Sequence, residues 1–207
     1  MTTDHADNLA GSAGSEAAHD GPWAGRRPRV AVVVSAYNAW ITDRLAEGAR
    51  EAYGRLVGPD AAREGAAAGE AGLTVHAVPG SFELAAGCRM AAGAGLYDAV
   101  VALGCVIKGE TEHDRFINQA VATELARLGG EVGEHGGGCA AVTFGLITAN
   151  TAEQAEARAG GAHGNKGAEA MEAALEMIKL RDRLREGARA AFERAIAEAQ
   201  REALHGE

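Results

Sequence analysis

Residues 99–113 read Ala-Val-Val-Ala-Leu-Gly-Cys-Val-Ile-Lys-Gly-Glu-Thr-Glu-His, and they predict both a fold and a site. The apolar run Ala99–Leu103 is typical of a buried strand, and the glycine-flanked polar loop after it leads into a helix. In an open α/β sheet, ligands bind where strands end and helices begin. A helix N-terminus attracts anions, and His113 in its first turn can move protons near neutral pH. The stretch therefore predicts chemistry on a phosphorylated small molecule.

Apolar and amphipathic segments alternate on both sides of this stretch. The chain contains four short apolar runs, which we predict to be strands at Arg29–Val34, Leu73–Val78, Ala99–Leu103 and Ala140–Ile147. After each run, apolar residues recur at the spacing of a helix. Strands of this length joined by helical crossovers form a parallel sheet with right-handed connections. The expected fold class is α/β: a three-layer α/β/α, flavodoxin-like domain whose four-stranded parallel sheet has helices on both faces.

Both ends of the chain differ in composition from this domain. Residues 1–28 are rich in Gly, Ala, Ser, Asp and His without periodicity, so we expect a disordered tail before a domain at 29–180. The last helix of the domain is expected to break at Gly160-Gly161, to resume after Gly164–Gly167 and to end with the domain. Residues 181–207 keep helical spacing among many charges. They fit either an amphipathic helical extension that packs on a partner or on its own domain, or a partly frayed charged tail.

The composition limits the classes of function. The net charge of −9 argues against nucleic acid as a partner, because phosphate backbones require basic surfaces. No apolar run approaches the roughly 20 residues of a membrane span, and the first residues lack the features of a signal peptide, so we expect no membrane association. The three cysteines lack metal-ligand spacing, which favours reduced thiols in a cytoplasmic protein.

Aromatic and polar residues follow the first two predicted strands and should meet at one edge of the sheet. Tyr37 can stack on a flat ring of a ligand or simply pack over the sheet edge. After the second strand, Pro79-Gly80 forces a turn, and Ser81 can cap the next helix. Glu83 can accept hydrogen bonds from sugar hydroxyls or merely complement the helix dipole. Each residue alone therefore has a structural explanation beside the functional one.

Two further features offer groups that suit phosphate. In the loop within residues 99–113, the Thr111 hydroxyl can contact phosphate. We assign Glu110 a contact through its backbone only, because a carboxylate pointing inward would repel the anion. Near the expected break of the last helix, Arg158 and Lys166 supply cations. The chain has no phosphate-binding loop, dinucleotide fingerprint, zinc motif or nucleophile elbow. This favours general acid–base chemistry and positioning of reactants over covalent or metal catalysis.

Five segments taken together resemble the lumazine synthase family. In the family's order they are residues 33–42 (VVSAYNAWIT), 78–84 (VPGSFEL), 103–113 (LGCVIKGETEH), 144–148 (FGLIT) and 153–167 (EQAEARAGGAHGNKG). The resemblance implies condensation of 5-amino-6-(D-ribitylamino)uracil with 3,4-dihydroxy-2-butanone 4-phosphate to 6,7-dimethyl-8-ribityllumazine. Phosphate and water are released, and no cofactor takes part.

The resemblance also implies roles for individual residues. His113 matches the family's proton-transfer residue, and Tyr37 matches an aromatic residue that stacks on the pyrimidine. Phe144 and Arg158 match residues that a neighbouring subunit contributes, the first closing over the ring and the second binding phosphate, and Lys166 is a further contact. The remaining implied substrate contacts are Ser81, Phe82, Glu83, Cys105, Val106, Ile107, Glu110 and Thr111.

Family members assemble as pentamers, and some as shells of sixty subunits. The resemblance therefore implies a homo-oligomer of at least five subunits, with riboflavin synthase as a further candidate partner. The compact Gly160–Gly167 segment is associated with the shell type. Pro22 and Pro28 argue against it, because they could not donate hydrogen bonds in the edge strand that precedes the domain. The sequence therefore does not decide between a pentamer and a shell of sixty subunits. Asp114 stands where an aromatic is common in the family. It either orients the His113 ring or is solvated at the helix N-terminus.

Two other functions compete with the enzyme. One is a catalytically idle cage or scaffold that keeps the fold, and the other is a flavodoxin-like domain that binds a flavin or pteridine without turnover. The intact set of Tyr37, Glu83, His113, Phe144 and Arg158 favours the enzyme. A binding module would not need an arginine supplied across a subunit interface.

Overall fold

The structure, a computed structural model, describes Trp23 and residues 27–58, 72–130 and 140–205. Its main sheet is parallel and has the strand order β2-β1-β3-β4. The strands are β1 (Val30–Ser35), β2 (Leu73–Val78), β3 (Ala99–Ile107) and β4 (Ala141–Ala149). The predicted four-stranded parallel sheet is confirmed.

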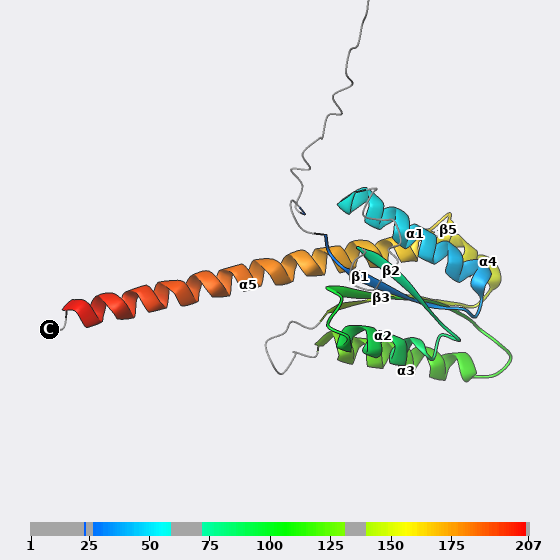
Figure 1. Ribbon diagram of the computed structural model, residues 1–207. Coiled ribbons are helices and arrows are strands. Elements are labelled where there is room, and N and C mark those ends of the chain that lie inside the picture. Colours follow the sequence, from blue (N-terminus) through cyan, green and yellow to red (C-terminus); the bar gives the residue numbers. More distant parts are fainter. Residues whose placement is uncertain (1–22, 24–26, 59–71, 131–139, 206–207) are drawn as a thin grey trace, which may run out of the picture.

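Helices cover both faces of this sheet (Figure 1). One face carries α1 (Ala39–Val57) and α5 (Lys166–His205), and the other carries α2 (Leu84–Gly93) and α3 (His113–Gly130). The two faces have separate hydrophobic clusters, and successive residues of β1 alternate between them: Val30 and Val32 belong to one, Ala31 and Val33 to the other. The three-layer α/β/α architecture is therefore confirmed.

Strand β3 is longer than predicted. It continues past Leu103, because residues 105–107 pair in register with residues 147–149 of β4. The predicted end at Leu103 is wrong, because Gly104 does not begin the loop. Gly104 instead permits close packing inside the strand, since a Cβ there would lie 2.5 Å from Leu146 and 2.8 Å from Leu84. The polar loop therefore begins at Lys108.

The expected break in the last helix is a small hairpin. A short helix, α4 (Ala152–Ala157), is followed by the antiparallel strands β5 (Ala159–Gly161) and β6 (Gly164–Asn165). Thr151 and Gln154 have the spacing of a capping box, and the Thr151 hydroxyl accepts a hydrogen bond from the Gln154 amide at 3.3 Å. The glycines thus form a turn that carries the chain back toward α1.

The start of α5 is fixed against α1 by an asparagine and a glycine. The Asn165 Oδ1 accepts hydrogen bonds from the amides of Gly167 (2.8 Å) and Ala168 (3.2 Å), while its Nδ2 donates to the Arg44 carbonyl at 2.8 Å. A Cβ on Gly167 would collide with the backbone oxygen of Leu45. Only glycine therefore allows this close contact between the two helices.

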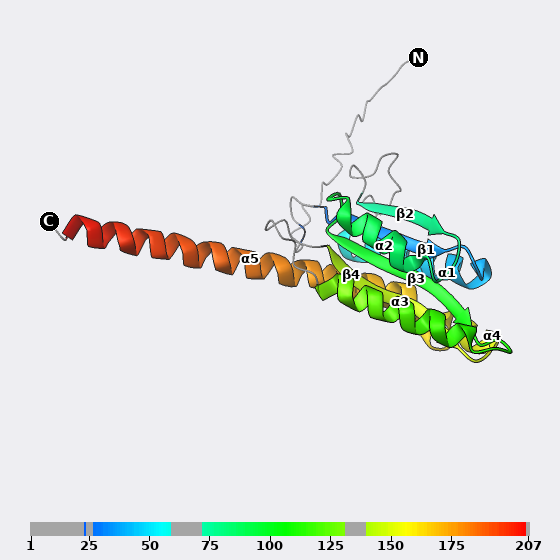
Figure 2. The same ribbon diagram turned by 90° about the horizontal axis from the view of Figure 1, so that it is seen from below.

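Helix α5 does not end near Leu180 as predicted. It continues without interruption to His205 and projects far beyond the sheet (Figures 1 and 2). Where it leaves the domain, Arg181 donates hydrogen bonds to the carbonyl (3.1 Å) and the carboxylate (3.3 Å) of the buried Asp98. The same carboxylate accepts a hydrogen bond from the Arg29 amide at 2.8 Å, so one acidic side chain joins β1, β3 and α5.

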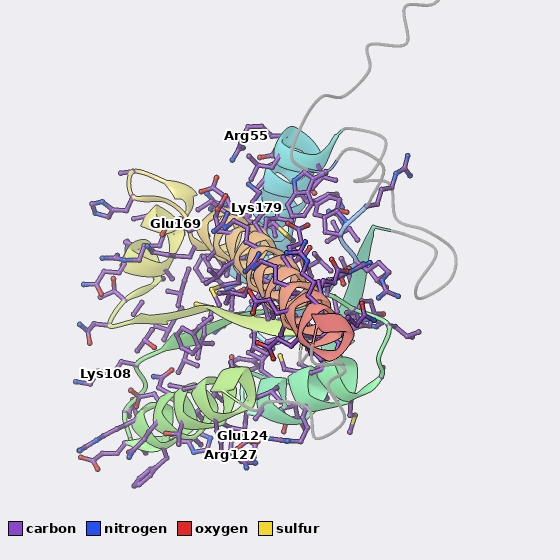
Figure 3. All side chains as sticks on the ribbon, turned by 90° about the vertical axis from the view of Figure 1, so that its left-hand side faces the viewer. Arg55, Lys108, Glu124, Arg127, Glu169 and Lys179 are labelled. Carbon is purple, nitrogen blue, oxygen red and sulfur yellow. The ribbon has the colours of Figure 1, made fainter. Side chains whose placement is uncertain are left out.

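Ionic contacts also join the two helices of the opposite face. Arg89 of α2 binds Glu124 of α3, which also pairs with Arg127 at 3.0 Å. Figure 3, which looks along α5, shows Glu124 and Arg127 on this face, across the sheet from α1. The two guanidinium groups, Arg127 foremost, lower the pKa of the Glu124 carboxyl to about 2. This surface network holds α2 and α3 together.

Most of the expected tail, residues 1–28, lies outside the described residues. Trp23 packs on the cluster between the sheet and α1, and the Lys179 ammonium lies 5.5 Å from its ring centre. The Pro28 carbonyl accepts a hydrogen bond from the buried Tyr53 hydroxyl at 2.6 Å. The chain therefore contacts the domain before β1 begins. Within the described part of the chain, no helix combines the length and apolarity needed to cross a membrane.

Two glycines of α5 are expected to respond in opposite ways to alanine. Gly167→Ala should lower the free energy of unfolding by about 2 kcal/mol, because the new methyl group forces α5 away from α1. Gly187→Ala, in the same helix with nothing near its Cβ position, should raise it by about 0.5–1 kcal/mol through helix propensity. Denaturation followed by circular dichroism measures both. A neutral Gly167→Ala would contradict the close contact.

Candidate active site

A pocket of about 700 Å³ lies at the carboxyl ends of β1, β2 and β3 and at the start of α3. It brings together most of the predicted site residues from segments far apart in the sequence. The members that were predicted are Tyr37, Ser81, Phe82, Glu83, Cys105, Val106, Ile107, Thr111 and His113. The others in the lining are Asn38, Gly80, Gly109, Asp114 and Ile117.

The walls of the pocket combine flat apolar surface with a few polar groups. The Tyr37 and Phe82 side chains are 69% and 57% exposed, far more than aromatic residues of a core, so both rings are available to a ligand. Glu83 is also exposed. Val106 and Ile107 at the end of β3 add apolar surface to the lining. Such a pocket suits a planar ring that carries a hydroxylated chain.

Asn38 lines the pocket, and the sequence reasoning did not name it as a site residue. It has a left-handed backbone (φ 60°, ψ 43°) and is the only non-glycine with positive φ among the described residues. Its Nδ2 donates a hydrogen bond to the Cys105 carbonyl at 3.0 Å, and its own carbonyl accepts from the Ile41 amide at 2.9 Å. Asn38 therefore fixes the direction of the neighbouring Tyr37 relative to β3. The signal was present, since asparagine tolerates this backbone conformation better than most residues.

Ser81 does not cap the next helix, contrary to the prediction. Helix α2 begins at Leu84 with Glu83 at the N-cap position, and no side chain caps it. The Ser81 hydroxyl instead points into the packed interior, 3.0 Å from the Cβ position of Gly104, and has no hydrogen-bond partner among the described residues. A buried hydroxyl without a partner is costly unless something supplies one, which is consistent with its place in the lining of a ligand site.

Cys105 lies in the pocket as a neutral thiol. Burial raises its pKa to about 11, so the thiolate is scarce at neutral pH. A protonated thiol is a poor nucleophile, so Cys105 forms part of the wall and does not attack substrate.

His113 is the group in this pocket suited to proton transfer. It opens α3, and its backbone amide donates to the Thr111 hydroxyl at 3.4 Å, which satisfies one of the free donors of the helix start. The side chain is exposed and shares the pocket with Tyr37, Phe82 and Glu83. Asp114 makes no described hydrogen bond or ion pair with His113, which favours the solvated alternative for its carboxylate.

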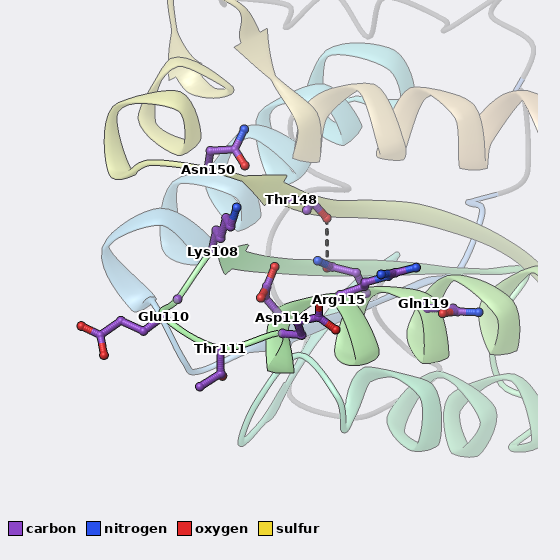
Figure 4. Close-up of a pocket in the computed structure, with 11 residues that line it drawn as sticks. Lys108, Glu110, Thr111, Asp114, Arg115, Gln119, Thr148 and Asn150 are labelled. Carbon is purple, nitrogen blue, oxygen red and sulfur yellow. Dashed lines mark hydrogen bonds between the residues drawn. The ribbon is translucent and has the colours of Figure 1, made fainter.

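The loop before α3 separates this pocket from a second, polar one of about 760 Å³ (Figure 4). Glu110 lines only the second pocket, and Figure 4 shows its carboxylate directed away from the other labelled side chains. This agrees with the backbone role given to Glu110. Across the second pocket, the Thr148 hydroxyl donates to Asn118 Oδ1 at 2.9 Å and ties β4 to α3.

The three remaining predicted residues lie outside both pockets of this chain. Phe144 is on the edge strand β4 and is 49% exposed. Arg158 and Lys166 are held side by side, because the Lys166 amide donates to the Arg158 carbonyl at 2.9 Å across the hairpin. The Lys166 ammonium lies 2.5 Å from the Glu169 carboxylate. The structure therefore places the backbones of Arg158 and Lys166 side by side, outside the pocket that His113 lines.

In the pocket that His113 lines, the permanently charged residues of the described lining are all acidic. Glu83 and Asp114 are its acidic members, and its described lining contains neither lysine nor arginine. An anionic group bound there would meet His113 and the amides at the start of α3 but no permanent cation. A phosphorylated substrate would thus find only part of a binding site within one chain.

The comparisons with known proteins agree on one family. The family model described as 6,7-dimethyl-8-ribityllumazine synthase matches residues 27–182. A protein of Gemmatimonas aurantiaca named 6,7-dimethyl-8-ribityllumazine synthase is 44% identical over 159 residues, which are 77% of this chain and 87% of that protein. The matched region contains the whole sheet and both pockets. The chain therefore belongs to the 6,7-dimethyl-8-ribityllumazine synthase family.

Proposed function

We propose that the pocket of about 700 Å³ is where this lumazine synthase joins its two substrates in riboflavin biosynthesis. The family's reaction condenses 5-amino-6-(D-ribitylamino)uracil with 3,4-dihydroxy-2-butanone 4-phosphate and releases phosphate and water. An amine of the pyrimidine attacks the ketone to form an imine, phosphate leaves by elimination, and the second amine closes the ring. Each step moves protons, and holding both substrates together supplies much of the rate.

The observation that carries this proposal is the composition of the pocket. Two exposed aromatic rings, a carboxylate and His113 converge there from three segments of the chain, which matches a pyrimidine that bears a polyol. In our assignment, Tyr37 stacks on the pyrimidine, and Glu83 accepts hydrogen bonds from the ribityl hydroxyls. Ser81, Phe82 and residues 105–107 line the remaining contacts, and Thr111 with the Glu110 backbone faces the phosphate.

The cations for phosphate come from a second subunit in this proposal. Arg158 and Lys166 are adjacent on the hairpin yet absent from the described lining of their own chain's pocket. We therefore propose that they and Phe144 complete the site of a neighbour in a homo-oligomer of at least five subunits. The free thiols of Cys88 and Cys105 support a cytoplasmic location.

The first test is formation of the fluorescent lumazine from the two substrates. We expect product well above the spontaneous background from the purified chain. His113→Ala should lower kcat about 10- to 100-fold, near the low end of general acid–base contributions, with little change in pyrimidine binding. Steady-state kinetics measures both. Product no faster than in the absence of protein would refute the proposed function.

The role of Arg158 is tested by its effect on each substrate. Arg158→Ala should raise KM for the butanone phosphate about 10- to 100-fold, the loss expected for a charge-assisted hydrogen bond, and should affect KM for the pyrimidine little. Arg115→Ala, an exposed arginine of the second pocket, is the matched control and should leave both values near wild type. Equal effects of Arg158→Ala on both substrates would refute the phosphate assignment.

The sharing of sites is tested by mixing the two impaired variants and measuring activity at a butanone phosphate concentration well below KM, where each variant alone is slow. In oligomers co-assembled from equal amounts of His113→Ala and Arg158→Ala chains, each shared site has a one-in-four chance of combining two intact halves. About a quarter of wild-type activity should therefore return. Oligomers that stay as slow as the separate variants would show that His113 and Arg158 do not act from different chains.

A further inference from the structure

At the edge of the sheet that holds the pocket, β3 extends further than β1. The pairing of β1 with β3 ends at Val34 and Leu103, whereas β3 continues along β4 to Ile107. Residues 104–107 therefore have no partner in β1. Cys105, which is only 1% exposed, belongs to this part of the strand. Its backbone carbonyl needs another hydrogen-bond donor, because a buried polar group without a partner is costly.

The side chain of Asn38 supplies this donor. Its Nδ2 donates a hydrogen bond to the Cys105 carbonyl at 3.0 Å, from a position beyond the end of β1 at Ser35. An asparagine at a helix N-cap normally turns its side chain to the free amides of the helix start. Asn38 is the N-cap residue of α1 but makes no such bond. Its side-chain amide therefore serves the contact with β3 and not the capping of α1.

The backbone of Asn38 is held by α1. Its carbonyl accepts hydrogen bonds from the amides of Ile41 at 2.9 Å and Thr42 at 3.1 Å. Its left-handed conformation, with φ 60° and ψ 43°, turns the chain between β1 and α1. Asparagine and glycine adopt this conformation at a lower cost than other residues. Asn38 thus joins the start of α1 to the end of β3.

Tyr37, which directly precedes Asn38, is held through its backbone and not through its ring. Its carbonyl accepts a hydrogen bond from the Ser35 hydroxyl at 3.4 Å. The ring is 69% exposed, and it makes neither a hydrogen bond nor a ring contact with the described residues. The residues on either side therefore set the direction in which the ring leaves the chain. Asn38 connects this direction to β3, whose residues 105–107 line the same pocket.

We propose that Asn38 is a positioning residue for the pyrimidine. Its side-chain amide holds the Tyr37 ring in a fixed direction relative to the end of β3, so that the pyrimidine meets Tyr37 and residues 105–107 together. This inference rests on the proposed function, in which Tyr37 stacks on the pyrimidine. Without the amide, binding would have to order the Tyr37 ring, and the entropy lost would oppose it. The butanone phosphate has no ring to stack, so its binding would change little.

The kinetics of two Asn38 variants test this role. Asn38→Gly removes the side-chain bond, and glycine accepts the left-handed backbone. KM for the pyrimidine should rise about 5- to 20-fold, which is part of what a stacked aromatic ring contributes, while KM for the butanone phosphate stays near wild type. Asn38→Asp keeps the size of the side chain but has no N–H to donate, and it should give the same result. Equal changes in both KM values, or wild-type values from either variant, would overturn the proposal.

Asn118→Ala is the matched control at the same edge of the sheet. It removes the hydrogen bond that the Asn118 Oδ1 accepts from the Thr148 hydroxyl, drawn as a dashed line in Figure 4, and should leave both KM values near wild type. A control that raises KM for the pyrimidine as much as Asn38→Gly would refute a specific role of Asn38. Circular dichroism checks the fold of each variant. Loss of the fold in both Asn38 variants would show a structural role and would also overturn the proposal.

A double-mutant cycle shows whether Asn38 acts through Tyr37. Tyr37→Ala should weaken equilibrium binding of the pyrimidine about 10- to 100-fold, and Asn38→Gly added to it should weaken binding little further. Additive effects would show that Asn38 does not act through the ring, which would refute the proposed role. Calorimetry with the pyrimidine alone measures this binding without turnover. A failure of the positioning role is therefore distinguishable from a failure of the proposed function, which is measured by product formation.

Discussion

The pairing of β3 with β1 on one side and β4 on the other sets the position of nearly every other element. Because the pairing is parallel and in register, all four strands end at one edge of the sheet. The Cys105 carbonyl at this edge binds Asn38, and the Lys108 amide binds the Ala149 carbonyl at 2.8 Å. The loops that carry Tyr37 and His113 are therefore anchored to the same buried strand, and the geometry of the pocket follows from its register.

Sequence patterns predicted the layers of the fold well, because a strand buried on both faces must be apolar throughout and an amphipathic helix must repeat its apolar residues. They failed where one residue type serves two purposes. Gly104 ends no strand but makes room for Leu84 and Leu146, and the segment near Gly160 forms a hairpin and not a kinked helix. Ser81 resembles a cap in sequence, yet only the packing of α2 against β3 decides where its hydroxyl lies.

Most of the site could be predicted because its residues follow strands, and parallel strands end together. The position of Arg158 relative to His113 could not, since no pattern within one chain encodes a contact between chains. The structure adds a physical reason for the separation. A pocket whose described lining contains Glu83 and Asp114 but neither lysine nor arginine binds a phosphorylated substrate poorly on its own. Under the proposed arrangement, a lone subunit would be inactive, and assembly would switch catalysis on.

Because α5 is continuous from the Asn165 cap to His205, it is also a rigid element of the structure. A helix of 40 residues is about 60 Å long, and its first half is clamped by α1, β4 and the Asp98 contacts. The second half therefore acts as a stiff spacer. A protein fused directly after His205 would be held about 30 Å from the catalytic domain, at a distance set by helix geometry and not by a flexible linker.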